Sequence, residues 1–209
     1  MPLTNRVDPF GEIFAHPARG LWMGNRGWLH DASGRILRPW QVRRWIICQL
    51  EFRGRHREVM SPRRTWTELF FLDEATAFAA GHRPCGECRN ADYRRFRALW
   101  RALHPSDPPG VDAIDRRLHE ERVIGRQKRV SRADLSTLPD GTFITKNGRA
   151  WLVLDRALLA WSPAGYVERQ DRAPGGEVDV LTPSSIVELF RGGYRPHVHA
   201  TSTSPIPPR

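Results

Sequence analysis

Two cysteines separated by two residues, Cys85 and Cys88, are the side chains of this sequence best suited to chemistry. Pro84 precedes the first cysteine, and Gly86 lies between the two. A tight turn of this kind lets two thiolates reach one metal ion, and glycine allows backbone amides to point back at the sulfurs. The pair could instead be a redox dithiol, which is expected to open a helix in a βαβ unit, or two structural thiols. The pattern favours a zinc knuckle.

A closed structural zinc site needs four ligands, and the sequence contains only one further cysteine, Cys48. It lies on the apolar face of an alternating stretch, 43–52, which predicts a strand. Cys48 is therefore either a buried apolar thiol or a third zinc ligand, and we predict a ligand because the site needs a donor. For the fourth position we expect His56, in an arginine-rich turn, with His82 as the alternative.

Two predicted helices flank the cysteine pair. Residues 73–81 predict a short helix that Asp73 caps and Gly81 ends. Residues 90–103 predict a longer amphipathic helix, because its apolar residues recur at spacings of three and four: Tyr93, Phe96, Leu99, Trp100 and Leu103. Its other face is rich in arginine, which indicates either a solvated surface or contacts with phosphate. The predicted nucleic-acid contacts are Arg83, Arg89, Arg94, Arg95, Arg97 and Arg101.

The stretch 70–88 resembles the metal-binding domain of the Ada DNA-repair family, a treble-clef module that also occurs at the ends of some nucleases. The residues that carry the resemblance are Phe70, Phe71, Glu74, Ala75, Ala79, Ala80, Gly81, Arg83, Pro84, Cys85 and Cys88. The resemblance implies a treble-clef zinc fold. It also implies two upstream ligands, commonly a cysteine pair or a histidine and a cysteine, where this chain has Cys48 without a second cysteine nearby.

The charge balance indicates a polyanionic partner. The 209 residues contain 33 Lys and Arg against 23 Asp and Glu, a net charge of +10, and nearly all of the positive charge is arginine. Arginine forks match phosphate geometry and stack on bases, so the expected partner is nucleic acid, DNA rather than RNA. An arginine-rich overall composition without functional meaning is the alternative. The eight tryptophans could supply stacking surfaces, although most are expected in the core.

Several classes of protein are disfavoured by the sequence. The start lacks the pattern of a signal peptide, and no apolar run approaches the roughly 18 residues of a membrane span, so we expect a cytoplasmic protein without membrane contact. Three cysteines do not make a disulfide scaffold. The sequence contains no G-x-S-x-G motif, no P-loop and no G-x-G-x-x-G after a strand, which leaves hydrolase, NTPase and dinucleotide-binding functions without support.

The predicted fold class is α+β. We expect a β-rich unit with the zinc knuckle and the basic helix over 1–104, and a helical connector over 105–137. A small β-rich unit with one closing helix follows over 138–199, and a disordered tail over 200–209. In the last unit, Asn147-Gly148 predicts a hairpin, and Thr182 and Gly192 bound the closing helix. His197 and His199 alternate on a predicted final strand, where a bound metal is conceivable.

The connector offers a second candidate metal site. Asp112, Asp115 and His119 recur at spacings of three and four on the predicted helix 111–125, so they share one face. They could bind a catalytic divalent ion or form salt bridges with Arg116 and Arg122.

These features lead to three functional hypotheses. The leading one is zinc-dependent nucleic-acid binding, in DNA repair or modification, with structural zinc positioning the arginine-rich helix. The second is chemistry on nucleic acid, as a metal-dependent nuclease or as an Ada-like acceptor of a phosphotriester methyl group. The third is a protein-interaction module with architectural zinc. The sequence does not decide whether the protein is an enzyme, or its oligomeric state.

Overall fold

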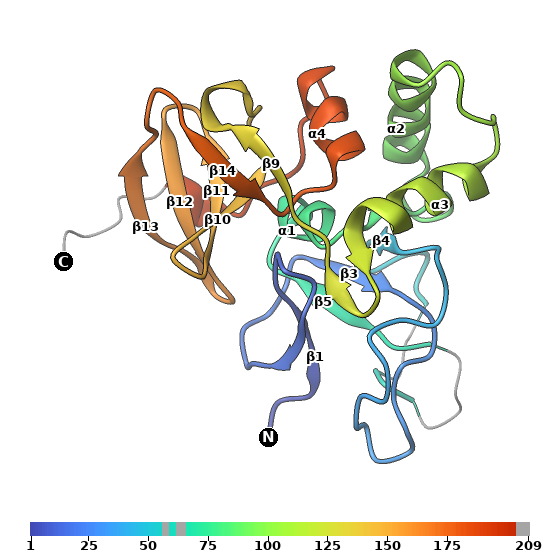
Figure 1. Cartoon of the computed structure of the whole chain (residues 1–209). Helices are drawn as coiled ribbons and strands as arrows, with labels where there is room; N and C mark the ends of the chain where they lie inside the picture. The colour runs from blue at the N-terminus through green and yellow to red at the C-terminus, as the bar shows by residue number, and fades with distance from the viewer. Residues whose placement is uncertain (56–58, 62–65, 204–209) are drawn as a thin grey trace.

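The computed structural model describes residues 1–55, 59–61 and 66–203, and within them the chain forms a mixed α+β structure. Two six-stranded sheets are joined by a central helix, and three further helices lie along one side (Figure 1). The predicted α+β class is therefore confirmed.

The first sheet is built from the N-terminal part of the chain and is mixed. Its strands run in the order β2-β1-β5-β3-β4-β6. They are β1 (Thr4–Val7), β2 (Ile13–Ala15), β3 (Trp22–Asn25), β4 (Ile46–Cys48), β5 (Leu69–Phe71) and β6 (Arg83–Pro84). The pairs β1–β5 and β4–β6 are parallel and the others are antiparallel. The parallel β4–β6 pair matters most for function, because it brings the residues after position 84 beside the end of β4.

The second sheet is antiparallel throughout, in the order β13-β12-β11-β10-β14-β9. Its strands are β9 (Ser131–Asp134), β10 (Phe143–Lys146), β11 (Arg149–Leu154), β12 (Ala157–Ser162), β13 (Gly165–Asp171) and β14 (Glu177–Val180). Asn147 and Gly148 form the predicted hairpin turn between β10 and β11, both with positive φ, as a primed turn requires. A two-stranded hairpin, β7 (Val123–Ile124) and β8 (Gln127–Lys128), precedes this sheet.

Helix α1 (Glu74–Ala79) lies between the two sheets, and every one of its residues is buried. Alanines on one side belong to an apolar cluster with the second sheet, while Ala77 and Phe78 pack into the cluster of the first sheet. Asp73 caps the helix as predicted, because its carboxylate accepts a hydrogen bond from the Thr76 amide at 2.8 Å. A helix this short is stabilised by burial on both sides rather than by its own propensity.

The remaining helices are α2 (Asn90–Leu103), α3 (Val111–Arg122) and α4 (Ser184–Arg191). The bounds of α2 are those predicted from its apolar stripe, and Phe96 and Trp100 are buried. One apolar cluster contains Phe78 of α1, Phe96 of α2, Leu118 of α3 and Phe190 of α4, so the four helices share a core.

The C-terminal region differs from its prediction in two respects. Pro183 rather than Thr182 precedes the first turn of α4, since the Thr182 hydroxyl accepts a hydrogen bond from the Phe143 amide instead. The predicted final strand is not formed, because the amides of His197 and His199 donate to the carboxylates of Glu74 and Asp73. Short 3-10 helices occur at Leu135–Thr137 and Ala200–Ser202. Residues 204–209 of the predicted tail lie outside the described part of the chain.

Among the described residues, no helix is both long enough and apolar enough to cross a membrane.

Candidate metal centre

The three cysteines of the chain come together at one edge of the first sheet. Cys48 ends β4, and the parallel pairing of β4 with β6 places Pro84 opposite Ile47. The Cys85 amide continues this pairing with a 2.9 Å hydrogen bond to the Ile47 carbonyl. All three thiols are free and buried, and their sulfur atoms lie within 4.8 Å of one another. The structure thus unites the predicted ligands Cys48, Cys85 and Cys88.

The turn between the paired cysteines has the features of a metal knuckle. The Glu87 amide donates to the Cys85 sulfur at 3.4 Å, and the Asn90 side chain donates to the Gly86 carbonyl at 2.8 Å. A Cβ atom at Gly86 would lie 3.2 Å from the Tyr93 ring, a tight contact that explains the small residue in the turn. Helix α2 starts directly after the turn, so its direction depends on the position of the cysteines.

The thiols perturb one another strongly. Hydrogen bonds from Cys48 and Cys88 lower the pKa of Cys85, and the bond to Cys85 raises the pKa of Cys48. The three sulfurs therefore compete for protons, and the thiolate form is favoured at Cys85 over Cys48. A divalent ion would replace those protons and neutralise all three thiolates, which is the usual coupling of metal binding to cysteine ionisation.

The geometry of the cluster suits a tetrahedral ion. Zinc–sulfur bonds of about 2.3 Å in a tetrahedron place the sulfurs about 3.8 Å apart, a separation that the cluster meets with little movement. Three buried cysteines at this spacing could hold a metal ion, and soft thiolate ligands favour zinc among the common candidates.

The fourth ligand is not His82. Its ring is fully buried, its Nε2 accepts a hydrogen bond from Arg26 Nε at 3.2 Å, and it packs 4.7 Å from the Phe71 ring centroid. Burial and the neighbouring cations Arg26 and Arg122 lower the pKa of His82 well below its ordinary value, which keeps the ring neutral. The alternative assignment of His82 is thus corrected. The preferred candidate, His56, lies outside the described residues.

A cavity of about 310 Å³ opens onto the cysteine cluster. All three cysteines line it, together with Arg44, Arg55, Glu68 and Glu87. Its carboxylates are engaged elsewhere. Glu68 accepts from the Met60 amide and the Trp66 indole, both at 2.8 Å, and Glu87 pairs with Arg55. The described part of the chain thus supplies three thiols and an opening beside them, rather than a closed four-ligand shell.

Two of the predicted nucleic-acid contacts prove to be structural. Arg83 is 2% exposed, and its Nε and Nη2 donate to the two carboxylate oxygens of Asp115 at 2.8 and 2.7 Å. Arg89 is 4% exposed and pairs with Glu74 at 2.6 Å and with Asp92 at 2.7 Å. Because both guanidinium groups are buried and occupied by carboxylates, the structure corrects their assignment as phosphate contacts.

The Arg89 pairing holds the beginning of α2 against the beginning of α1. The Tyr194 hydroxyl also donates to Glu74, at 3.0 Å, and the guanidinium of Arg89 lies 4.1 Å from the Trp22 ring. Asp92, the one acid of α2, forms its ion pair within this network, with Arg89. The outer face of α2 therefore presents cations without a compensating carboxylate of its own.

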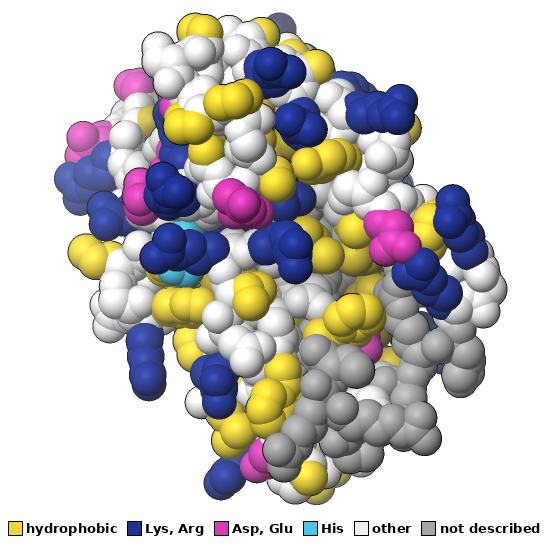
Figure 2. Space-filling view, turned by 90° about the vertical axis from the view of Figure 1, so that its right-hand side faces the viewer, with side chains coloured by type: hydrophobic (Ala, Val, Ile, Leu, Met, Phe, Trp, Pro, Cys, Tyr) yellow, Lys and Arg dark blue, Asp and Glu magenta, His cyan; other side chains and the backbone are white. Residues whose placement is uncertain are grey.

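The four other predicted contacts lie on that outer face. Arg94, Arg95 and Arg101 are exposed and Arg97 is partly exposed. Arg95 lies 4.4 Å from the Tyr194 ring, and Arg97 donates to the Pro109 carbonyl at 3.3 Å. Figure 2 shows the side of the molecule on which α2 and α3 lie in Figure 1, with many more basic than acidic side chains. These four arginines are placed where a polyanion could reach them.

The second candidate metal site is not assembled. Asp115 is committed to Arg83, Asp112 is exposed, and His119 packs against Trp40 at 5.6 Å between ring centroids. In the described segments, the cysteine cluster is the only group of three or more metal-ligating side chains that comes together. His197 and His199 are therefore not part of such a group. The salt-bridge interpretation of Asp115 is the correct one, although its partner is Arg83 rather than Arg116 or Arg122.

No family model matches the chain, and neither a curated protein nor a solved structure matches it significantly. The resemblance of residues 70–88 to the Ada metal-binding domain therefore stands on the motif alone. Two buried arginines were missed from the sequence, Arg26 and Arg122. Nothing in their local sequence distinguishes them from the other arginines, since their burial follows from contacts made far along the chain.

Proposed function

We propose that this protein binds nucleic acid, DNA before RNA, through a basic face that a zinc-centred knuckle holds in position. The observation that carries the proposal is the placement of α2. This helix begins directly after Cys88 and packs its apolar stripe into the core, and its only acid is neutralised internally. Arg94, Arg95, Arg97 and Arg101 then face outward together. Zinc acts as architecture here, in the manner of a treble clef.

Contacts of this kind recognise phosphate and therefore set affinity rather than sequence preference. Each phosphate neutralised releases counterions, so the affinity should fall steeply with salt, with a slope of about −0.9 per contact on a logarithmic plot for duplex DNA. A surface that uses three or four arginines should lose about two such contacts when two of them are reversed in charge.

The test is fluorescence anisotropy with a labelled DNA duplex over a range of salt concentrations. The variant Arg94→Glu with Arg101→Glu should bind more weakly and show a shallower salt dependence. Arg132 provides the control, because it is exposed on the second sheet and already paired with Glu177 and Asp179. Arg132→Glu should leave binding unchanged. If Arg132→Glu weakened DNA binding as much as the double variant of α2, α2 would have no special role in binding.

A second candidate function is supported by the cavity beside the cysteines. In an Ada-like reaction, a thiolate sulfur attacks the methyl carbon of a phosphotriester, forming a sulfur–carbon bond and releasing the phosphodiester anion. The cavity leaves the cluster approachable, and Arg44 beside it is the candidate contact for the phosphate, whereas Arg55 is already paired with Glu87. Mass spectrometry after incubation with methyl-phosphotriester DNA decides between the two functions. A single methyl on Cys48, Cys85 or Cys88 supports transfer, whereas unmodified cysteines leave binding as the function.

A further inference from the structure

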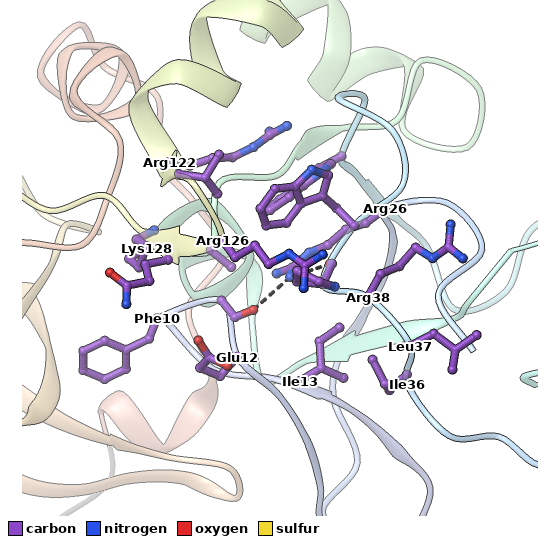
Figure 3. Close-up of a pocket in the computed structure, with 17 residues that line it drawn as sticks. Phe10, Glu12, Ile13, Arg26, Ile36, Leu37, Arg38, Arg122, Arg126 and Lys128 are labelled. Atoms are coloured by element: carbon purple, nitrogen blue, oxygen red, sulfur yellow. Dashed lines mark hydrogen bonds between the residues drawn. The ribbon is translucent and has the colours of Figure 1, made fainter. Parts of the chain in front are cut away.

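A second cavity, of about 320 Å³, lies where the loops of the first sheet meet α3 and the β7–β8 hairpin (Figure 3). Its walls carry five cationic side chains and one acid: Arg26, Arg38, Arg122, Arg126, Lys128 and Glu12. It shares no lining residue with the cavity beside the cysteines. An accumulation of cations in a concave site indicates a place for an anion, provided that the cations are not already neutralised.

Arg26 is the most informative of these side chains, because it is 1% exposed and yet incompletely bonded. Its Nε donates to His82, and its Nη1 donates to the carbonyls of Gly11 at 2.8 Å and Pro39 at 3.5 Å. Its Nη2 is buried and has no hydrogen-bond partner among the described residues. Figure 3 shows this guanidinium group at the centre of the cavity. A buried arginine donor without a partner is costly, so a missing acceptor is indicated.

Arg122 repeats the pattern from α3. It is also 1% exposed, and it donates to the carbonyls of Gly81 at 2.7 Å and Arg43 at 2.5 Å. Its Nε is buried, and the described chain offers it no acceptor. Both guanidinium groups lie against the indole of Trp45, at 4.1 Å for Arg26 and 3.8 Å for Arg122. The indole of Trp45 is therefore in contact with two buried cations.

The carboxylates nearby do not balance this charge. Asp8 and Glu12 act on Arg26 from a distance, and Asp115 is already bound to Arg83. Neither Arg26 nor Arg122 forms an ion pair with a carboxylate in the described ranges. Burial lowers the pKa of Arg26 to about 9, and burial together with repulsion from Arg26 and Arg122 lowers that of Lys128 to about 7. Burying these cations thus costs free energy, and a bound anion would offset that cost.

We propose that this cavity binds the phosphate monoester of a nucleotide, with the phosphate held by Arg26, Arg126 and Lys128. Planar guanidinium donors match the geometry of phosphate oxygens, and a surplus of cations in the cavity suits the charge of about −2 on a phosphate monoester. Trp40, Ile13 and Ile36 also line the cavity and offer an aromatic and aliphatic surface to the attached nucleoside. The volume lies at the lower end of the range for small-molecule sites, which suits one nucleotide.

The phosphate monoester could belong to a free mononucleotide or to the 5′ end of a strand. The cavity shares no lining residue with the cavity beside the cysteines and includes no residue of α2, so the proposal does not depend on the proposed function. Binding stabilises the folded state by an amount that grows with the logarithm of the ligand excess, and the melting temperature therefore reports binding.

The test compares adenosine 5′-monophosphate, adenosine and inorganic phosphate by thermal shift and calorimetry. Adenosine 5′-monophosphate should raise the melting temperature and bind more tightly than inorganic phosphate, and adenosine should do neither. Arg126→Ala or Lys128→Met should weaken binding about tenfold or more, since each removes a charge-assisted contact. Arg129→Ala is the matched control, because Arg129 is exposed next to the same hairpin and does not line the cavity.

A competition experiment identifies the source of the phosphate. If an oligonucleotide with a 5′-phosphate displaces labelled nucleotide better than the same strand with a 5′-hydroxyl, the ligand is a strand end. Equal, weak competition by both strands identifies the free nucleotide. The proposal is overturned if adenosine 5′-monophosphate does not bind the wild-type protein, or if Arg126→Ala and Lys128→Met bind it no more weakly than Arg129→Ala.

Discussion

The buried pair of Arg83 and Asp115 offers the sharpest test of how the knuckle is held to the rest of the protein. The side chains are 3% and 4% exposed and share two hydrogen bonds, at 2.7 and 2.8 Å. Asp115→Ala leaves the guanidinium of Arg83 buried without its carboxylate. Loss of one partner of such a pair costs about 3–5 kcal/mol, because the remaining charge has neither water nor a counterion.

The expected result follows from the size of the chain. A domain of about this length loses about 2–4 °C of melting temperature per kcal/mol, so Asp115→Ala should lower it by about 6–20 °C. Thermal melts followed by circular dichroism measure the shift, and urea titrations measure the free energy of unfolding. Asp112→Ala is the matched control on the same helix, since Asp112 is exposed and its replacement should cost less than about 0.5 kcal/mol.

A double variant separates the pair from the packing around it. Arg83→Met combined with Asp115→Leu removes both charges and should recover much of the stability, because apolar replacements of a buried pair are often nearly neutral. If Asp115→Ala were as stable as the wild type, or the double variant no more stable than the single one, the ion-pair argument would be refuted. Loss of a nuclease activity without loss of stability would instead restore Asp115 as a metal ligand.

Three further predictions concern the metal, the turn after α1 and the basic cavity. Chelation of the metal, or Cys88→Ser, should lower the melting temperature by about 10 °C or more, because metal binding is coupled to folding. Purified protein that contains no metal, and whose melting temperature does not change on chelation or in Cys88→Ser, would contradict this. Gly81→Ala should destabilise the fold by at least about 1 kcal/mol in urea titrations, since Gly81 has φ of +93° and its new Cβ would lie 2.5 Å from Arg122 Cδ; unchanged stability would show that Arg122 can move aside. The free energy of unfolding should rise between pH 7 and 9, by up to about 1.4 kcal/mol per pH unit. Burial lowers the pKa of Lys128 from 10.5 to about 7, so in this range the unfolded chain binds a proton that the folded chain has lost. Lys128→Met should flatten this rise, and an equal slope in the variant would assign the effect to another group.

The elements predicted correctly are those with local signals. Asp73 and Gly81 bound α1 because capping and positive φ are properties of single residues. The length of α2 follows from its apolar stripe, and the hairpin at Asn147 follows from its turn residues. Cys48 was assigned to the site because a closed zinc centre needs a further donor, although the alternation of its strand also fitted a buried apolar thiol. Apart from the assignment of Cys48, each of these inferences needs only the nearest neighbours in the sequence.

The errors share a different cause. Arg83 and Arg89 resemble the exposed arginines of α2 in sequence. In the structure both are buried, and they form ion pairs with carboxylates of α3 and α1 respectively. The expected strand at 192–199 does not form, because the side-chain carboxylates of Asp73 and Glu74 accept the hydrogen bonds from backbone amides that a neighbouring strand would accept. Partners so distant along the chain leave no mark on local composition. Burial of charge is therefore the property that sequence patterns predict least well.

The segment 81–89 links the candidate metal centre to the basic cavity. The Gly81 carbonyl and the His82 ring accept hydrogen bonds from Arg122 and Arg26, the two buried cations of the cavity. Two residues beyond Arg83, which is tied to α3, the chain reaches Cys85.

A metal ion that fixes the cysteines limits where His82 and Gly81 can lie, and so restrains the donors of Arg26 and Arg122 as well. Positioned donors bind an anion with less loss of conformational entropy than mobile ones. A metal bound by the cysteines would thus act on the cavity through the order of this segment, since the two cavities share no lining residue. By linkage, an anion held in the cavity would favour the metal-bound form by the same free energy.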